Sequence, residues 1–228
     1  MVLRCGSSGF SFKEWKGPFY PDSLQPADML EHYASRLPTV EINNTFYRMP
    51  RREMLAGWTK KVPPSFRFAV KAPRRITHSK KLVNCEQEIG WFYGALDALG
   101  DRLGIVLYQL PPHAQVDTDA LAWFLGKLPD GAATAFEFRH PSWRDEAVVE
   151  LLGAHGAAWV VTDTDGTGAT TIPLCSENAY LRLRAEAYSD GLLREWKDQC
   201  ANFERAFVFF KHEEGGTAPK LAERMLTL

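Results

Sequence analysis

Short runs of β-branched and aromatic residues alternate along the chain with longer segments whose apolar residues recur at helical spacing. This alternation is typical of βα units, whose parallel strands share one sheet. It predicts eight strands, at Val2–Cys5, Thr39–Ile42, Arg67–Lys71, Gly104–Gln109, Thr134–Phe138, Ala158–Thr162, Ala179–Leu183 and Ala206–Phe210. It predicts helices at Pro26–Arg36, Glu53–Lys61, Glu86–Leu99, Thr118–Lys127, Asp145–His155, Asp190–Ala201 and Pro219–Leu228.

Eight strands with interleaved helices favour a closed α/β barrel of the (β/α)8 TIM type over an open sheet. Asp163–Ala169 is rich in Gly, Asp and Thr, so we expect a loop and no regular helix after the sixth strand. Ser142 and Asp145 have the spacing of a capping box at the start of the fifth helix. Because no linker or repeat interrupts the pattern, residues 1–228 are predicted to form a single domain.

The composition excludes several classes of protein. Hydrophobic residues make up 45% of the chain and the formal net charge is -1, which suits a globular protein without a strong overall attraction to nucleic acid. No apolar run approaches the roughly 18 residues that cross a bilayer, and no secretory signal is visible. The four cysteines lie far apart, as expected of reduced thiols in a cytoplasmic protein. We expect no membrane association and no obligate protein partner.

The alternation of side chains along each strand predicts which polar residues point into the barrel. Side chains that face the outer helices must be apolar, so Val40 and Ile42 point outward and Glu41 points into the barrel. The same reasoning directs inward Asn43, Lys71, Gln109, Glu137, Arg139, Asp163, Tyr180, Arg182, Arg184 and Lys211. They lie at or near the carboxyl ends of strands, where α/β barrels hold their active sites. Cations outnumber carboxylates there, which favours an anionic ligand, although any single pair can also be a structural ion pair.

The loops after the strands add donors and aromatic rings. Tyr47 and Arg48 follow the second strand, and His140 and Trp143 follow the fifth, where Trp143 forms either a pocket wall or part of a helix start. Lys71–Lys81 contains His78 and is either a binding segment or a solvated basic loop. The backbone N–H groups of Gly6–Phe10 suit an anion. The aromatic run Phe10–Pro21 is predicted to form a lid over the barrel mouth or to pack in the core.

Five segments resemble the YecE-like family, also called domain of unknown function 72. They are Gly6–Gly17, Val40–Arg48, Phe66–His78, Gln109–Pro112 and Glu137–Trp143, and they extend over much of the chain. The resemblance implies an α/β barrel. The distant likeness of that barrel to endonuclease IV implies nucleic-acid processing by analogy of fold alone.

The last third of the chain departs from the family pattern. A His-Gly pair usually follows the seventh strand, whereas Arg182–Glu186 stands here and Tyr188 is retained. An Asn-Asn pair usually ends the eighth strand, whereas Lys211–Glu213 takes its place. The additional cations indicate a changed ligand.

We favour an enzyme that acts on a phosphorylated or phosphodiester substrate. Arg182, Arg184 and Lys211 hold the anion in this hypothesis. Glu41 or Glu137 is the general base, and Lys71 or His78 is the general acid. The remaining ligand-binding candidates are Asn43, Tyr47, Arg48, Gln109, Arg139, His140, Trp143, Asp163 and Tyr188.

Two alternatives remain. A metal-dependent hydrolase or isomerase would use Glu41, Glu137, Asp163 and His212 as ligands, although the sequence requires no cofactor and lysines and arginines crowd the same rim. A non-catalytic binder of nucleic acid or of an anionic metabolite would use the basic loop Lys71–Lys81.

Overall fold

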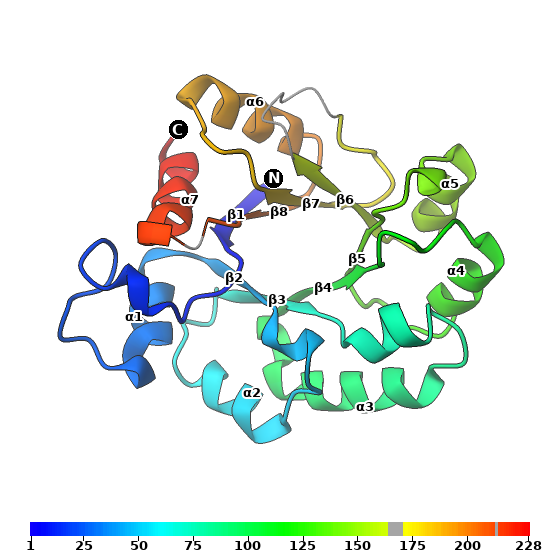
Figure 1. Cartoon of the computed structure of the whole chain (residues 1–228), viewed down its shortest axis with the longest axis horizontal. Helices are drawn as coiled ribbons and strands as arrows, with labels where there is room; N and C mark the ends of the chain where they lie inside the picture. The colour runs from blue at the N-terminus through cyan, green and yellow to red at the C-terminus, as the bar shows by residue number, and fades with distance from the viewer. Residues whose placement is uncertain (164–170, 213) are drawn as a thin grey trace.

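The computed structural model describes residues 1–163, 171–212 and 214–228. Its eight parallel strands form a nearly closed barrel surrounded by helices (Figure 1). The strands are β1 (Val2–Ser7), β2 (Thr39–Ile42), β3 (Arg67–Lys71), β4 (Leu103–Gln109), β5 (Thr134–Glu137), β6 (Ala158–Asp163), β7 (Asn178–Leu183) and β8 (Arg205–Phe210). The helices are α1 (Met29–Arg36), α2 (Arg52–Thr59), α3 (Glu86–Leu96), α4 (Thr118–Leu125), α5 (Glu146–Ala154), α6 (Asp190–Cys200) and α7 (Thr217–Thr227).

The predicted (β/α)8 barrel is confirmed, with every strand found close to its expected bounds. The predicted loop after the sixth strand lies largely outside the described residues, and residues 171–177 contain no helix. The predicted capping box is wrong in one detail. Asp145 itself is the N-cap of α5, because its carboxylate accepts the Ala147 N–H at 2.9 Å. The Ser142 hydroxyl instead accepts the Val116 N–H at 2.9 Å.

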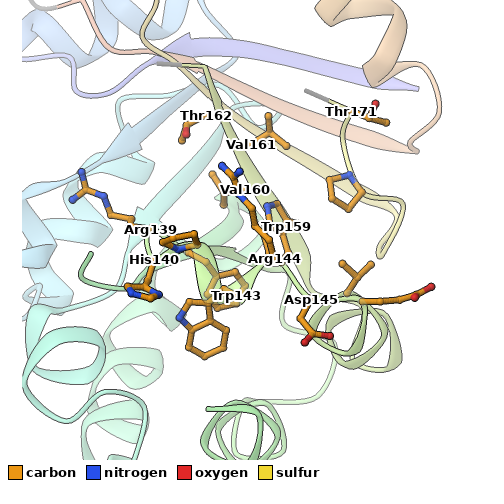
Figure 2. A pocket seen from close by; sticks show the side chains of 15 residues that line it. Arg139, His140, Trp143, Arg144, Asp145, Trp159, Val160, Val161, Thr162 and Thr171 are labelled. Atoms are coloured by element: carbon orange, nitrogen blue, oxygen red, sulfur yellow. The ribbon is translucent and has the colours of Figure 1, made fainter. Parts of the chain in front are cut away.

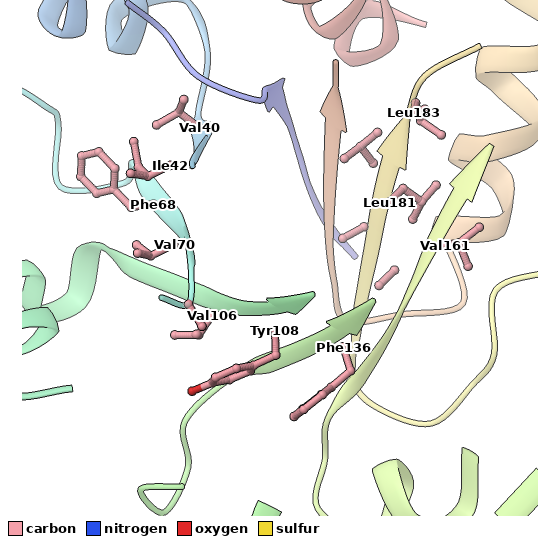
Figure 3. Close-up of a cluster of buried hydrophobic side chains, with 14 of the residues drawn as sticks. Val40, Ile42, Phe68, Val70, Val106, Tyr108, Phe136, Val161, Leu181 and Leu183 are labelled. Atoms are coloured by element: carbon pink, nitrogen blue, oxygen red, sulfur yellow. The ribbon is translucent and has the colours of Figure 1, made fainter. Parts of the chain in front are cut away.

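The strands carry two separate layers of apolar side chains. Val40, Ile42, Leu181 and Leu183 belong to the outer layer, between the sheet and the helices (Figure 3). The barrel interior holds a smaller cluster: Ala69, Ile105, Leu107, Ala135, Ala158, Val160, Tyr180, Phe207 and Phe209. This interior cluster fills the lumen below the polar residues at the strand ends. The predicted sorting of faces is therefore confirmed for β2, β3, β5 and β7.

Side chains bridge the seam between β1 and β2, the two strands at the ends of the hydrogen-bonded order. The Tyr33 hydroxyl accepts the Ser7 N–H at 2.9 Å and donates to the Thr39 carbonyl at 3.0 Å. A Cβ atom on Gly6 would lie 2.1 Å from the Thr39 oxygen, so only glycine fits there. These contacts hold the two strands close enough for their loops to share one site.

None of the described helices is both long and apolar enough to cross a bilayer. All four cysteines are buried and unpaired, as the spacing predicted.

Candidate functional site

A cavity of about 430 Å³ opens at the carboxyl ends of the strands. Its cationic lining residues are Lys71, Arg139, Arg182, Arg184 and Lys211. Its aromatic lining residues are Phe10, Phe12, Phe46, Tyr47 and Trp58. Among the described residues, no carboxylate lines this cavity. The acidic residues of the barrel mouth must therefore lie below the surface that a ligand would contact.

Glu41 is fully buried and surrounded by donors. Its Oε1 accepts from Ser8 Oγ at 2.8 Å, from Asn43 Nδ2 at 2.9 Å and from Arg182 Nη2 at 2.9 Å. Its Oε2 accepts from Tyr180 Oη at 2.7 Å and from Arg182 Nε at 2.9 Å. With five donors on two oxygens, the carboxylate has little capacity left to accept a proton from a substrate.

Burial alone would raise the pKa of Glu41, but the charge of Arg182 and these hydrogen bonds outweigh it and lower the pKa to about 2. A carboxylate with so low a pKa is a weak base at neutral pH. The geometry thus argues against the general-base role that the sequence suggested for Glu41, and it favours a structural role.

Glu137 completes the buried ion pairs. Arg182 Nη1 donates to Glu137 Oε2 at 2.5 Å, so one guanidinium joins β7 to both β2 and β5. Burial again opposes ionisation, yet Arg182 and Arg184 lower the pKa of Glu137. Burial lowers the pKa of Arg182 less than the two carboxylates raise it, so the three groups stay charged. Glu137 is therefore held as a partner of Arg182 and is poorly suited to act as a base.

Lys71 lies at the cavity, on the face of β3 that points into the barrel. Its Nζ donates to Gln109 Oε1 at 2.6 Å and sits 4.1 Å from the centre of the Phe46 ring. Burial and the charge of Arg182 lower its pKa to about 8, against the opposing effect of Glu41 and Glu137. An amine in this state is largely protonated at neutral pH but gives up its proton readily, as a general acid must.

Arg184 and Arg139 reach the cavity from the ends of β7 and β5. Arg184 Nη2 lies 3.6 Å from Glu137 Oε1, and Arg139 Nε lies 3.9 Å from the same oxygen. Both distances exceed those of a strong ion pair. The buried Nε of Arg184 has no hydrogen-bond partner within the described part of the protein. Burial and the neighbouring Arg182 lower the pKa of Arg184, so an incoming anion would relieve repulsion as well as supply an acceptor.

Asp163 and Tyr188 lie elsewhere. Asp163 shares the outer face of β6 with Val161, so the expectation that it points into the barrel is wrong. Its carboxylate accepts the Arg184 N–H at 2.6 Å and the Tyr188 hydroxyl at 2.5 Å. The two residues fix the loop that presents Arg184, and neither lines the cavity.

His78 packs against the ring of Phe46 at 4.9 Å rather than lining the cavity. Its Nδ1 lies 2.9 Å from Thr77 Oγ1. Burial, followed by the charges of Lys71 and Arg74, lowers the pKa of His78 to about 4. The imidazole is therefore neutral at physiological pH and holds no proton to donate as an imidazolium. This leaves Lys71 as the better placed of the two predicted acids.

His140 and Trp143 line a second cavity of about 670 Å³, which shares Arg139 with the first (Figure 2). Trp143 is 2% exposed and its indole N–H donates to the Ala114 carbonyl at 2.8 Å. Its ring stacks on Phe138 with centroids 4.3 Å apart. Trp143 is thus anchored in the packing beside α5, and its buried ring forms part of the wall of this second cavity. Arg48 is exposed and lines a groove outside the main cavity.

The four residues considered as metal ligands do not converge. Glu41 and Glu137 form ion pairs with Arg182, and Asp163 accepts hydrogen bonds from the Tyr188 hydroxyl and the Arg184 N–H. His212 Nε2 lies 2.6 Å from the Ala185 carbonyl oxygen. Across the part of the chain that the structure describes, no group of three or more His, Cys, Asp or Glu has the arrangement of a metal site. The residues present do not fit the predicted metal centre.

Three N–H groups of the first loop already have acceptors within the protein, which argues against the predicted anion site there. The N–H groups of Ser7, Ser8 and Gly9 donate to Tyr33, Phe210 and Ser7 respectively. The aromatic run that follows divides in two. Phe10 and Phe12 line the cavity, whereas Trp15 and Tyr20 are buried beside α1.

Sequence reasoning missed three contributors. Ser8 and Tyr180 cap the Glu41 carboxylate, and Trp58 brings an aromatic wall from α2. Tyr180 was expected to face inward, but not as a partner of Glu41. Trp58 carries no signal in the sequence, because its helical spacing resembles that of any core aromatic.

Comparison with known proteins identifies the family. The family described as "Protein of unknown function DUF72" matches residues 4–228. This chain belongs to that family. The UPF0759 protein YecE of Escherichia coli K12 is 33% identical over 115 residues, which span 50% of this chain and 42% of YecE. The UPF0759 protein YunF of Bacillus subtilis is 24% identical over 92% of this chain and 89% of YunF.

Solved structures of the DUF72 family share the fold. A DUF72 protein from Thermotoga maritima has a TM-score of 0.83 and 27% identity, covering 100% of this chain and 98% of that protein. One from Enterococcus faecalis has a TM-score of 0.77 and 22% identity, covering 100% of this chain and 98% of that protein. The family match confirms the predicted family, and the two structures confirm the predicted barrel. None of them names a substrate.

Proposed function

We propose that this DUF72 protein is an enzyme that cleaves a phosphorylated or phosphodiester substrate at the barrel mouth, with Lys71 as the proton donor. One observation carries the proposal. The cavity is lined by five cations and, among the described residues, by no carboxylate, although the chain as a whole has a net charge of -1. Such a concentration of positive charge is stabilised by an anion that enters the cavity.

The cations other than Lys71 divide into two roles in this proposal. Arg184, Arg139 and Lys211 hold the phosphate oxygens and stabilise the charge that develops on them. Arg182 is held by its carboxylate partners and fixes the floor of the site. The planar guanidinium groups suit bidentate contact with a phosphate.

The chemical step transfers one proton from Lys71. Water supplies the oxygen that attacks phosphorus, the bond from phosphorus to the leaving oxygen breaks, and that oxygen takes a proton from the Lys71 ammonium. Lys71 is then reprotonated by the proton that the attacking water releases. Its pKa of about 8 suits both halves of this cycle.

The pH dependence of anion binding tests the role of Lys71. Sulfate keeps its charge between pH 6 and about 9.5, so a calorimetric titration reports the protein groups alone. The lowered pKa means that Lys71 loses its charge as the pH rises through about 8, and affinity should fall there. Lys71→Met should weaken sulfate binding about tenfold at pH 7 and remove the fall in affinity near pH 8. Lys71→Arg should keep the wild-type affinity at pH 7.

Turnover of bis(p-nitrophenyl) phosphate separates catalysis from binding. Wild-type protein should hydrolyse both this diester and diphenyl phosphate. Lys71→Met should lose much more of its turnover of diphenyl phosphate, because phenolate needs a proton to leave whereas p-nitrophenolate does not. The melting temperature of Lys71→Met should not fall, because burying the ammonium costs free energy that methionine does not. If the protein binds sulfate but turns over neither these diesters nor p-nitrophenyl phosphate, it is a non-catalytic binder and the proposed enzymatic activity is wrong. Absence of sulfate binding would refute both.

A further inference from the structure

We propose that the ligand carries a planar aromatic or heteroaromatic ring joined to its phosphate, as a nucleotide does. This inference rests on the proposed function and assigns the other half of the same cavity. The cations sit at the ends of β3, β5, β7 and β8, whereas the aromatic side chains come from the loops after β1 and β2 and from α2. The cavity is therefore polarised, with one wall for a charge and one for a ring.

Tyr47 is the stacking surface in this wall. It is 83% exposed, the largest exposure among the described large hydrophobic side chains, and its ring meets Phe46 edge to face at 5.1 Å. The Lys71 ammonium already lies over the ring of Phe46. Trp58 packs against Phe68 at 5.8 Å and against the edge of Phe10 at 6.2 Å. Tyr47 thus offers the ring with most free area, and stacking on it would bury an aromatic surface now left in water.

Polar groups beside this wall suit a heteroaromatic ring. Asn43 and Asn44 line the cavity shortly before Tyr47 in the chain, and the Asn43 amide also donates one N–H to Glu41. An amide presents both donors and acceptors, which match the edge of a nucleobase better than a plain phenyl ring. The cavity volume of about 430 Å³ suits one nucleotide-sized ligand.

The ring and phosphate have two possible sources. A groove of about 560 Å³ continues from the cavity past Phe46 and Tyr47, and its lining includes Arg48 and Arg74. These exposed cations could hold a further phosphate of a strand whose terminal nucleotide occupies the cavity. A free nucleotide would use the cavity alone. Both sources share the same chemistry at Tyr47.

The test first compares two ligands that differ only in the ring, ribose 5-phosphate and AMP, by calorimetric titration of the wild-type protein. A 5′-phosphorylated tetramer of adenosine, titrated in the same way, then tests for a strand. AMP should bind about tenfold more tightly than ribose 5-phosphate, because one stacked base adds that much. Tyr47→Ala should remove this advantage without changing the affinity for ribose 5-phosphate, and Tyr47→Phe should restore it. Trp91→Ala, which alters another exposed aromatic residue outside the cavity, should have no effect.

Each outcome decides the inference separately from the proposed function. If AMP and ribose 5-phosphate bind with equal affinity and Arg184→Met abolishes both, the proposed ring-binding wall is refuted and the phosphate site is supported. No binding of either ligand, nor of sulfate, would refute the proposed function itself. An advantage of AMP that survives Tyr47→Ala would refute the assigned stacking surface. The last comparison applies if Tyr47 contributes as proposed. If the tetramer binds more tightly than AMP and Arg74→Met reduces its affinity, the ligand is the end of a strand. If AMP binds more tightly than the tetramer, the ligand is a free nucleotide.

Discussion

The barrel mouth contains two groups of charged residues that differ in how far their charges are satisfied. Arg182 lies below the surface, 1% exposed, and makes close ion pairs with Glu41 and Glu137. Arg184 and Arg139 lie above it, with side chains 21% and 41% exposed and no ion pair shorter than 3.6 Å to Glu137. Both groups follow from similar strand-end positions in the sequence.

The difference teaches how to separate structural charges from charges available to a ligand. A buried charge that is fully paired cannot be exchanged without a large penalty, so it defines the shape of the site. A half-exposed charge with long contacts is stabilised by a new partner. Burial and pairing, rather than residue type, therefore distinguish the two groups.

Arg182→Met should produce the largest effect, because it leaves two buried carboxylates without their partner. We expect a loss of about 3–5 kcal/mol in the free energy of unfolding, measured by urea denaturation. Arg184→Met should change it by less than about 1 kcal/mol. The exposed Arg194→Met is the matched control. An Arg182→Met protein as stable as these two variants would show that the ion pairs are not structural.

The second largest effect should come from acid, which should reduce the stability that the buried Glu41–Arg182 ion pair contributes. The folded pKa of Glu41, about 2, lies below its ordinary value of 4.5, so its contribution is complete above pH 4.5 and is lost as the pH falls toward 2. That contribution amounts to a few kcal/mol, less than the effect of removing Arg182. Denaturation curves between pH 2 and 7 should show this decline, and Glu41→Gln should flatten it. The exposed Glu150→Gln should keep the wild-type profile, and an unchanged profile in Glu41→Gln would contradict the assignment.

Tyr188→Phe should have the smallest effect on stability of the three predictions. It tests whether a residue outside the cavity contributes to folding without contributing to ligand binding. It removes a hydroxyl that donates to Asp163 and accepts the Ala185 N–H, which should cost about 1–3 kcal/mol of stability. Sulfate affinity should stay within about twofold of wild type, since Tyr188 does not line the cavity. Calorimetry alongside thermal denaturation measures both. A tenfold loss of affinity would show that the Tyr188 hydroxyl is needed to position Arg184 for the ligand.

The fold was predictable because its physical causes are local. Helix-facing positions such as Val40, Ile42 and Leu181 must be apolar, and that requirement repeats in strand after strand. The inward direction of Glu41 and Arg182 follows from the same alternation. Their pairing does not, because 141 residues separate them and several other cations were equally plausible partners.

The errors also have physical reasons. In β6, Val160 and Val161 are both apolar, so alternation does not reveal which face Asp163 occupies. His78 was a reasonable acid by residue type, but burial, reinforced by the charges of Lys71 and Arg74, lowers its pKa, and residue type does not reveal that burial. Trp58 was missed because a helix contributes to the cavity from outside the strand pattern.

Arg182 connects three strands that are distant in sequence. The cations proposed to hold the phosphate in the cavity, Arg139, Arg184 and Lys211, lie just beyond strand ends. A lineage can therefore exchange Arg184 or Lys211 for other side chains while the barrel beneath stays the same. Under the proposed function, a change of ligand preference then requires substitutions at the rim alone. Arg184 and Lys211 directly follow β7 and β8, so exchanging them leaves the buried ion pairs of Arg182 in place.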